Sequence, residues 1–144
     1  MRLQVSLEDN FLEIAQMVTD KSVVLLIDRG LLDGSAYVDQ ETWDSLMDDM
    51  GTNPVRLRDD RYDGVLHMVT AADGAEEFYA SLSNEARYES AEEATLKDRK
   101  LRQAYMSHAK YSMIRNNYKD FNSKINAAKT EVQKFLNMRI GSDF

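Results

Sequence analysis

Apolar residues recur at helical spacing near the start of the chain. Steps of four, four and three residues separate the members of this series, which are Leu7, Phe11, Ala15 and Val18. Such steps place side chains on one face of a helix. Ser6 could cap this helix, with Asp9 three residues later in the place that Glu or Gln takes in a capping box. The pattern therefore predicts an amphipathic helix that begins after Ser6.

Three short runs are rich in apolar residues, and the first of them is apolar at every position. They cover residues 23–27, 65–69 and 111–115, and the first of them is followed by Asp28-Arg29-Gly30. A run that is apolar on both faces is typical of a strand covered on both sides, as in a parallel sheet. The three runs therefore predict three strands.

Helical patterns separate these runs. Asp39 could cap a helix that contains Trp43, Asn53-Pro54 marks a break, and residues 56–62 could form a short helical piece. Helices that alternate with strands are typical of α/β domains with a parallel sheet. The sequence therefore predicts an α/β domain with about three strands flanked by helices.

Two longer helices complete the pattern. Ser90 and Glu93 form a capping-box pattern for a helix that reaches Tyr105. Asp120 could cap a last helix, whose apolar positions are Phe121, Ile125, Ala128, Val132 and Phe135. The regular spacing in this last segment makes it the clearest helix of the chain.

The composition is that of one globular domain. The 144 residues are 43% apolar and 30% charged, and they include one proline and no cysteine. The lack of cysteine excludes disulfides, thiolate metal sites and a cysteine nucleophile. The longest apolar run, residues 23–27, is far shorter than the ~20 residues of a membrane span, and no secretory signal precedes it. We expect a single cytoplasmic domain over residues 1–144 that does not cross a membrane.

The net charge of −7 conceals two opposite parts. Residues 1–95 hold 7 basic and 21 acidic side chains, whereas residues 96–144 hold 11 basic and 4 acidic ones. The overall acidity argues against a nucleic-acid partner, because such proteins present a basic face. The basic last third could contact phosphates or an anionic membrane surface. It could equally be a solvated face, or it could dock against the acidic part of the chain.

Candidate chemistry follows the first apolar run. Ligands of open α/β sheets bind beyond the carboxyl ends of the strands, and Asp28 and Arg29 stand at such an end. An apolar strand ending in Asp is the Walker B pattern, in which the carboxylate orders Mg²⁺ or its water. In small kinases an acid-Arg pair at this place accepts a proton from the substrate hydroxyl and binds phosphate oxygens. The alternative is an aspartate that pairs with its neighbouring arginine or caps a helix.

Arginines form a second candidate group between the second and third runs. Arg87, Arg99 and Arg102 lie in a polar segment, and nucleotide kinases enclose phosphates with a helical flap that carries arginines. The alternative is an exposed helix with surface salt bridges. His67 lies inside an apolar run, where a core histidine is the simpler interpretation. His108 could cap the end of the preceding helix, and two isolated histidines make no zinc motif.

Several segments resemble one family of P-loop domains. Two of them are long: LLIDRGLLDGSAY at residues 25–37 and HMVTAADGAEEFY at residues 67–79. Shorter ones are residues 42–43, 57–63 and 86–89. They resemble the NadR/Ttd-type AAA domains, which comprise the ribosylnicotinamide-kinase-like domain of bacterial NadR proteins and the N-terminal domain of TRPL translocation defect proteins. The match runs from about Arg2 to Leu136, and it is closest to the translocation defect branch.

The resemblance implies a purine-nucleotide site. Complete members of the family bind GTP or ATP with Mg²⁺. By position, Asp28 corresponds to the Walker B acid that holds Mg²⁺ through water, and Arg29 to its phosphate-contacting neighbour. Arg87 corresponds to a lid arginine, within a lid-like region at about residues 80–108 that also contains Arg99. The resemblance places Asp33, Arg58 and Arg61 near the second substrate or phosphate group. It also implies phosphoinositide or phosphatidic acid binding, contact with trafficking proteins, and a cytoplasmic location that includes the periphery of membranes.

One element of the family is missing from the sequence. No segment reads G-x-x-x-x-G-K-S/T, the loop that holds nucleotide phosphates, whereas family members carry it before the segment that matches Arg2. We therefore expect residues 1–144 to be an incomplete domain that lacks the first strand and its loop. Nucleotide binding should be impaired, and the domain would be at most kinase-like or a GTPase. The alternative is a non-catalytic domain that binds a protein or an anionic lipid through its basic last third.

Overall fold

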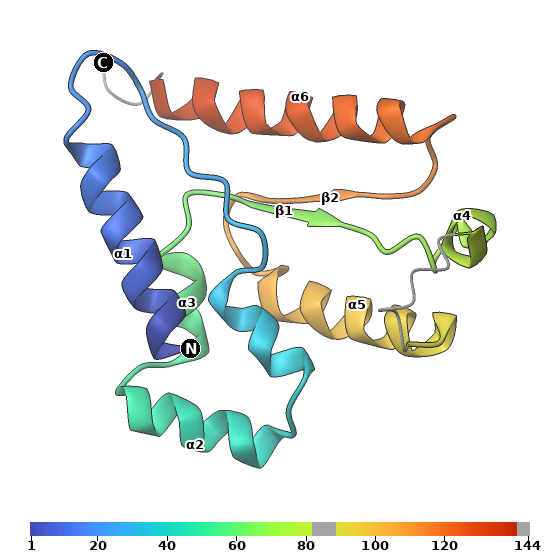
Figure 1. The fold of residues 1–144 in the computed structure, drawn as a ribbon, viewed down its shortest axis with the longest axis horizontal. Helices are drawn as coiled ribbons and strands as arrows, with labels where there is room; N and C mark the ends of the chain where they lie inside the picture. The colour runs from blue at the N-terminus through green and yellow to red at the C-terminus, as the bar shows by residue number, and fades with distance from the viewer. Residues whose placement is uncertain (82–88, 141–144) are drawn as a thin grey trace.

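The computed structural model describes residues 1–81 and 89–140. Figure 1 shows helices arranged around two short strands. In chain order the elements are α1 (Arg2–Gln16), the 3₁₀ helix η1 (Leu31–Ala36), α2 (Gln40–Met50), α3 (Pro54–Asp59), β1 (Val65–Met68), α4 (Glu76–Ser81), α5 (Ala91–Tyr105), β2 (Tyr111–Ile114) and α6 (Phe121–Ile140).

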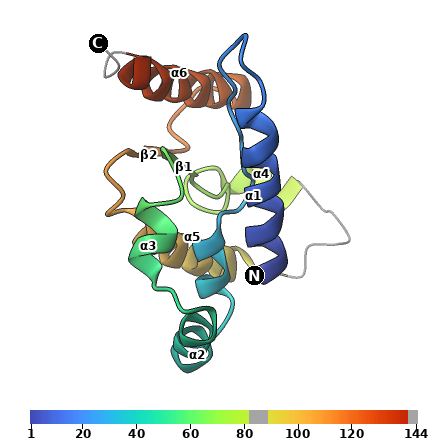
Figure 2. The same cartoon turned by 90° about the vertical axis from the view of Figure 1, so that its left-hand side faces the viewer.

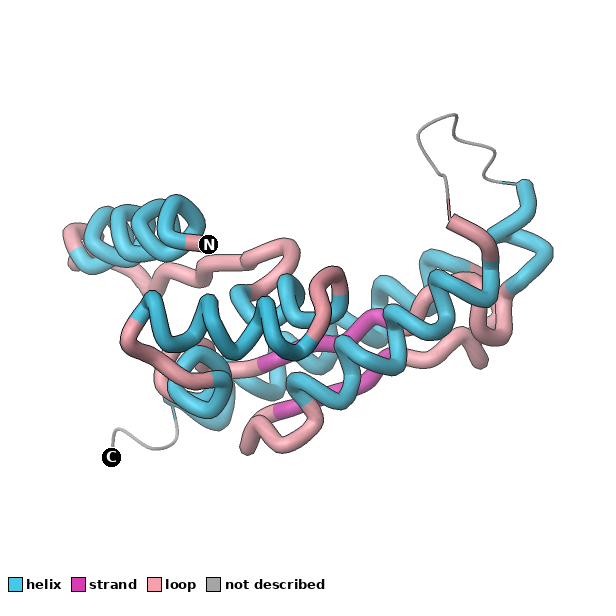
Figure 3. Tube along the Cα trace, turned by 90° about the horizontal axis from the view of Figure 1, so that it is seen from below, coloured by secondary structure: helices cyan, strands magenta, loops and turns pink. Residues whose placement is uncertain are grey.

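The two strands form a parallel pair. β1 and β2 pair from Val65 opposite Tyr111 to Met68 opposite Ile114, and Figure 3 shows them side by side among the helices. α6 lies on one side of the pair, and α5 and α3 lie on the other, as Figures 1 and 2 show from two directions. A parallel pair needs a crossover connection, which here contains α4 and α5. The predicted α/β class with a parallel sheet is confirmed.

The prediction of a strand at residues 23–27 is wrong. This segment forms no strand, so the sheet of the described residues has two strands rather than about three. All five of its side chains are exposed, and Leu26 is 80% exposed. A strand exists only where a neighbour binds its N–H and C=O groups, and periodicity carries no information about that neighbour. The apolar run therefore did not lead to burial in a sheet, because the described residues supply no partner strand for it.

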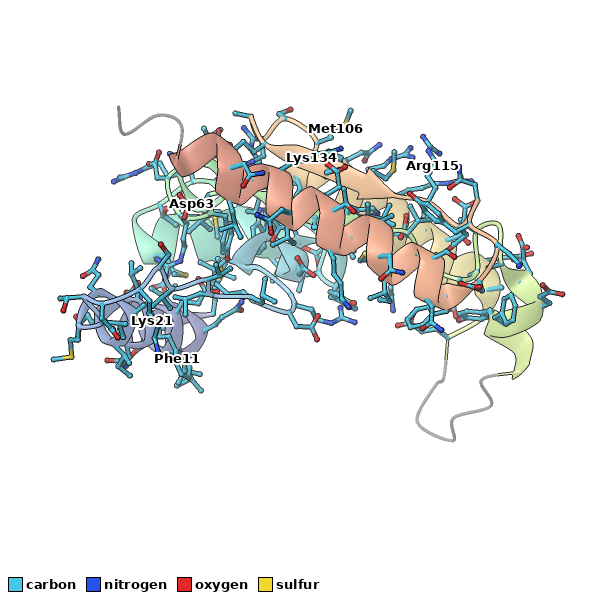
Figure 4. The ribbon with its side chains drawn as sticks, turned by 90° about the horizontal axis from the view of Figure 1, so that it is seen from above. Phe11, Lys21, Asp63, Met106, Arg115 and Lys134 are labelled. Atoms are coloured by element: carbon cyan, nitrogen blue, oxygen red, sulfur yellow. The ribbon has the colours of Figure 1, made fainter. Side chains whose placement is uncertain are left out.

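α1 is a helix whose apolar face stays exposed. It begins at Arg2 rather than after Ser6, and no side chain caps it. Phe11 is 58% exposed and projects from the outer side of the helix (Figure 4). Ionic contacts attach the helix to the loop after α3: Arg61 donates to Glu8 over 2.7 Å and to Asp9 over 2.6 Å. Val5 packs against the core, but Leu7 and Phe11 of the predicted apolar face stay exposed, which the sequence did not predict.

The other predicted caps are confirmed. The carboxylate of Asp39 accepts the N–H of Thr42 over 2.8 Å at the start of α2, and that of Asp120 accepts Ser123 over 2.7 Å at the start of α6. Ser90 and Glu93 form both hydrogen bonds of the capping box of α5. Each cap satisfies N–H groups that the first turn of a helix leaves unpaired. These helices therefore begin where the sequence predicts.

The best-buried part of the core surrounds η1, which the sequence did not predict. Leu31 and Leu32 are each 1% exposed, and they pack with Trp43, Met47, Leu57 and Tyr105. The side chains that cover η1 thus come from α2, α3 and α5. The segment directly after Asp28 and Arg29 is held rigidly, because its next two side chains are fully enclosed.

Two tyrosine hydroxyls bind the first turn of η1. Tyr62 accepts the N–H of Leu31 over 2.8 Å, and Tyr105 accepts the N–H of Leu32 over 3.1 Å. Burial raises the pKa of Tyr62 to about 12, and it raises the pKa of Tyr105 as well. Both hydroxyls therefore stay neutral in the folded state well above the pH at which a free tyrosine ionises.

This arrangement predicts a loss of stability at alkaline pH. The unfolded chain releases tyrosine protons near pH 10, whereas the folded chain keeps them, so the stability is present below pH 10 and is lost as the pH rises towards 12. We expect the free energy of unfolding to fall by about 2 kcal/mol over this range, measured by urea denaturation at several pH values.

The control is the variant Tyr62→Phe. Its free energy of unfolding should fall clearly less between pH 10 and pH 12 than that of the wild type. Lys124, whose pKa is lowered by burial, gives the opposite slope, but only below its ordinary value of 10.5. An equal fall in wild type and variant would contradict the assignment to Tyr62.

Candidate functional site

Asp28 and Arg29 form an exposed corner between the apolar segment 23–27 and η1. Arg29 has a φ of 67°, in the left-handed region, and it is the only non-glycine residue with positive φ in the described ranges. Its carbonyl oxygen accepts the side-chain amide of Gln4 in α1 over 2.9 Å. A non-glycine residue in this conformation costs on the order of 1–2 kcal/mol and persists only where its surroundings enforce it. The enclosed Leu31 and Leu32 provide that constraint on one side.

The side chain of Arg29 contacts Tyr37, and so does Lys97 of α5. Arg29 donates to the Tyr37 hydroxyl over 2.5 Å, and its guanidinium carbon lies 5.7 Å from the ring centroid. The Lys97 ammonium lies 5.0 Å from the same centroid and pairs with the Glu89 carboxylate. The hydrogen bond to Tyr37 raises the pKa of Arg29, and that to Glu89 raises the pKa of Lys97. We call these four residues the Tyr37 cluster.

Asp33 lies in η1 close to the Asp28-Arg29 corner. Burial raises the pKa of its carboxyl group, and a hydrogen bond from the Tyr105 hydroxyl and the charge of Arg29 oppose that rise. The charge of Asp28 acts on the same carboxyl group and raises its pKa further. The structure therefore brings together three of the residues that the sequence singled out: Asp28, Arg29 and Asp33.

The other predicted arginines have different surroundings. Arg58 donates to the carboxylate of Asp59 over 2.6 and 2.7 Å, and Arg61 binds Glu8 and Asp9. Both guanidiniums are thus paired with carboxylates of the chain. The Arg58 pair lies within α3, whereas Arg61 joins the loop after α3 to α1.

The lid-like region is described in part. Arg87 lies outside the described residues. Arg99 is exposed on α5 and lines a cavity of about 280 Å³ between that helix and the loop after β1, together with Ala72, Ala91, Glu92, Thr95 and Leu96. The structure thus places Arg99 beyond the carboxyl end of β1, which is where a ligand of an α/β sheet binds.

A polar clamp joins the loops that follow the two strands. The amide nitrogen of Asn116 donates to the carbonyls of Thr70 and Asp73, each over 2.7 Å. The buried Lys124 ammonium donates to the carbonyl of Val69 over 2.7 Å and to the Asn116 amide oxygen over 2.5 Å. A hollow of about 340 Å³ lies against these loops, and Asp73, Gly74, Arg115 and Asn117 are among its lining residues. The clamp fixes both loops at the edge of the sheet where ligands bind.

A buried pair supports the same edge from within. His67 of β1 faces Asp98 of α5 with 3.2 Å between Nε2 and Oδ2, and the other carboxylate oxygen accepts the N–H of Thr70 over 2.8 Å. His67 is thus a core histidine with a satisfied partner, as the sequence predicted. His108 is also buried: its Nδ1 accepts the N–H of Lys110, so Nε2 donates to the carbonyl of Tyr62.

Several of these residues were missed at the level of sequence. Nothing in the sequence indicated that Tyr37 and Lys97 meet, because their contact depends on how η1 packs against α5. Lys124 did give a signal: it lies four residues before Ala128, on the apolar face of α6, where an uncompensated charge is costly. A lysine in that position indicates a polar partner inside the domain.

The donor set at the corner fits magnesium held through water. Mg²⁺ keeps several waters and binds one or two carboxylates together with substrate phosphates. Asp28 offers an exposed carboxylate, and the half-buried Asp33 lies near enough for their charges to interact. In residues 1–81 and 89–140 no three His, Asp or Glu side chains come close enough to bind a metal by themselves.

Comparison with known proteins gives one match. The sequence model of a family described as AAA domain matches residues 1–123, a range that contains Asp28, Arg29, both strands and Asn116. Neither the curated proteins nor the solved structures contain a significant match to the chain. Among the helices that the structure describes, none offers an apolar stretch of the length a bilayer requires.

Proposed function

The chain belongs to the AAA domain family, and we propose that it binds a purine nucleotide at the Asp28-Arg29 corner. Domains of this family are nucleotide-binding domains of the P-loop NTPase type, and they generally bind the nucleotide with Mg²⁺. The observation that carries the proposal is the grouping of Asp28, Arg29 and Asp33 directly after an apolar segment, on both sides of the enclosed Leu31 and Leu32. The finer identity that we propose is a NadR/Ttd-type domain.

Each residue of the corner has a chemical role in this proposal. The Asp28 carboxylate holds Mg²⁺ through a water molecule, and the bound ion would reduce the charge of the phosphate oxygens. Arg29 donates hydrogen bonds to a phosphate, for which a planar guanidinium is well suited. Asp33, whose pKa is raised by burial, is the group that can exchange a proton with a substrate hydroxyl. Kinase-like or GTPase chemistry would use these same three groups.

The affinity of this chain should be low. A G-x-x-x-x-G-K-S/T loop binds phosphates with several backbone N–H groups at once, and no such loop occurs in residues 1–144. We expect the affinity for Mg-GTP and Mg-ATP to be weaker than micromolar by calorimetry. Micromolar or tighter binding of either nucleotide would contradict this expectation.

Asp28→Asn tests the role of the carboxylate. The change keeps the shape of the side chain and removes its charge, so the part of nucleotide binding that depends on Mg²⁺ should be lost. In NMR titrations with GTP and ATP, the wild type should bind about tenfold more weakly when Mg²⁺ is replaced by EDTA, whereas Asp28→Asn should bind equally in both conditions.

The matched control is Asp20→Asn, which removes the charge of another exposed aspartate before the apolar segment. This variant should keep the wild-type response to Mg²⁺. A response in Asp28→Asn as large as that of the wild type would refute the role of Asp28.

A further inference from the structure

The Tyr37 cluster adds two groups to the Asp28-Arg29 corner. Arg29 comes from the loop before η1, Tyr37 directly follows η1, and Lys97 comes from α5. Tyr37 is 49% exposed, so solvent and solutes reach its ring and hydroxyl. Two cations from different elements are thus held on one accessible aromatic side chain, next to the residue that we propose to bind Mg²⁺.

The direction of the hydrogen bond between Arg29 and Tyr37 leaves the phenolic proton of Tyr37 without an acceptor among residues 1–81 and 89–140. Arg29 can only donate, so the Tyr37 oxygen is the acceptor of the bond between them. The phenolic proton of Tyr37 therefore remains available for another acceptor. The remaining N–H groups of Arg29 and the ammonium of Lys97 are donors as well, so the cluster offers donors from three side chains and suits an anion.

A carboxylate of the chain already binds to one cation of the Tyr37 cluster. Glu89 pairs with Lys97, and both side chains remain partly exposed, 39% and 31% respectively. The position of Glu89 is fixed because its carbonyl accepts the Tyr79 hydroxyl over 3.1 Å at the foot of α5. A partly exposed ion pair is weak, so a solute with more negative charge can replace this carboxylate.

We propose that Tyr37 and Lys97 form, together with Arg29, a subsite for a phosphate group, and that Glu89 is the internal anion that this phosphate replaces. The inference rests on the proposed function in one respect, namely that the natural ligand is a nucleotide. The subsite itself would bind any polyphosphate. Carboxylate and phosphate oxygens are bound by the same donors, and phosphate carries more charge. Glu89 would then compete with phosphate for these donors. Only an anion with more negative charge than a carboxylate would displace it.

Tripolyphosphate is the probe, because it carries the phosphates without a base. In NMR titrations of the whole chain, Glu89→Gln should tighten its binding about threefold, since the competing anion is gone. Lys97→Met should weaken it about fivefold, and Lys97→Arg should stay within about twofold of the wild type. In the Lys97→Met background, the further change Glu89→Gln should have no effect, because the two residues act on each other.

The matched control is Lys134→Met, which also breaks a lysine-glutamate pair, that with Glu131 on α6 (Figure 4). It should alter tripolyphosphate binding less than twofold, as should Asp49→Asn, which breaks the exposed pair with Arg2. Thermal melting of each variant verifies the fold. If Lys97→Met behaves like Lys134→Met, or Glu89→Gln binds no more tightly than the wild type, the subsite is refuted.

GTP and ATP form the second arm and separate the two proposals. Nucleotide binding that depends on Asp28 but not on Lys97 would leave the proposed function standing and refute the subsite. Tripolyphosphate binding with the expected pattern, together with no binding of either nucleotide, would support the subsite and refute the nucleotide function.

Discussion

Asp98→Ala is expected to lower the free energy of unfolding by about 3 kcal/mol. Asp98 is 8% exposed, and its two carboxylate oxygens bind His67 of β1 and the N–H of Thr70. Alanine would leave both of these buried groups without a partner and would open a space beside β1. Each unsatisfied buried group costs about 1–3 kcal/mol, a large part of the 5–15 kcal/mol by which domains are stable. Urea denaturation followed by circular dichroism measures the change.

Asp98→Asn is the matched control for this change. The amide oxygen of asparagine can still accept the Thr70 N–H, and its nitrogen can donate to His67 in the other tautomer of the ring. We expect a loss of about 1 kcal/mol. If the alanine and asparagine variants lose the same small amount, the hydrogen bonds of Asp98 contribute little to stability and the assignment is wrong.

The contacts of Asp98 with His67 and Thr70 also affect the candidate site. Thr70 opens the loop that Asn116 and Lys124 hold at the carboxyl end of the sheet. Asp98 is therefore the inner support and Asn116 the outer support of one loop. A variant that loosens the inner support should also broaden the NMR signals of Asp73 and Gly74, which line the hollow beside the loop. Stability and the shape of this edge depend on the same hydrogen bonds.

The sequence predicts the helices well because their signals are local. The caps at Asp39, Ser90 and Asp120 and the apolar spacing of the last helix each depend on residues a few positions apart. η1 and α4 escaped prediction, because six residues show little of a period of 3.6; α3, which is as short, was predicted only in part, after the break at Asn53-Pro54. The start of α1 was wrong for a related reason: a helix without a side-chain cap gives no signal at its first turn.

A strand forms only where a second strand pairs with it, and the local sequence pattern does not reveal whether a second strand is available. Residues 65–69 and 111–115 were predicted as strands, and each finds the other in the parallel pair. Residues 23–27 are apolar at every position, unlike the two paired segments, and yet they stay unpaired and exposed. The difference lies in the presence of a neighbouring strand, which no property of the five residues contains.

The candidate site divides in the same way. Asp28, Arg29 and Asp33 are close in sequence, and the structure brings them together. Arg58 and Arg61 lie in a segment that resembles the NadR/Ttd-type domains. In the structure both form ion pairs with carboxylates of the chain. Lys97 enters the site only through the packing of α5 against η1. The sequence shows that these side chains are charged but not which side chains pair with them. The structure identifies the partners.

Gly30→Ala is expected to cost about 2–3 kcal/mol of stability. Gly30 has an ordinary backbone conformation, with φ −74° and ψ 172°, so its requirement is for space. A β-carbon there would overlap the Tyr105 hydroxyl and would lie 3.2 Å from the Tyr62 ring and hydroxyl. Both tyrosines would have to move, and their hydrogen bonds to Leu31 and Leu32 would weaken. Urea denaturation measures the loss.

Removing the hydroxyl that causes the overlap provides the control. Tyr105→Phe alone should destabilise the fold by about 1 kcal/mol, because the N–H of Leu32 loses its acceptor. In this background the further change Gly30→Ala should cost at least 1 kcal/mol less than it does in the wild type, since the β-carbon no longer meets an oxygen. Equal costs in both backgrounds would show that the overlap is relieved elsewhere. The expected coupling would instead establish that the glycine next to Asp28 and Arg29 is required because two tyrosine hydroxyls hold the first turn of η1 against it.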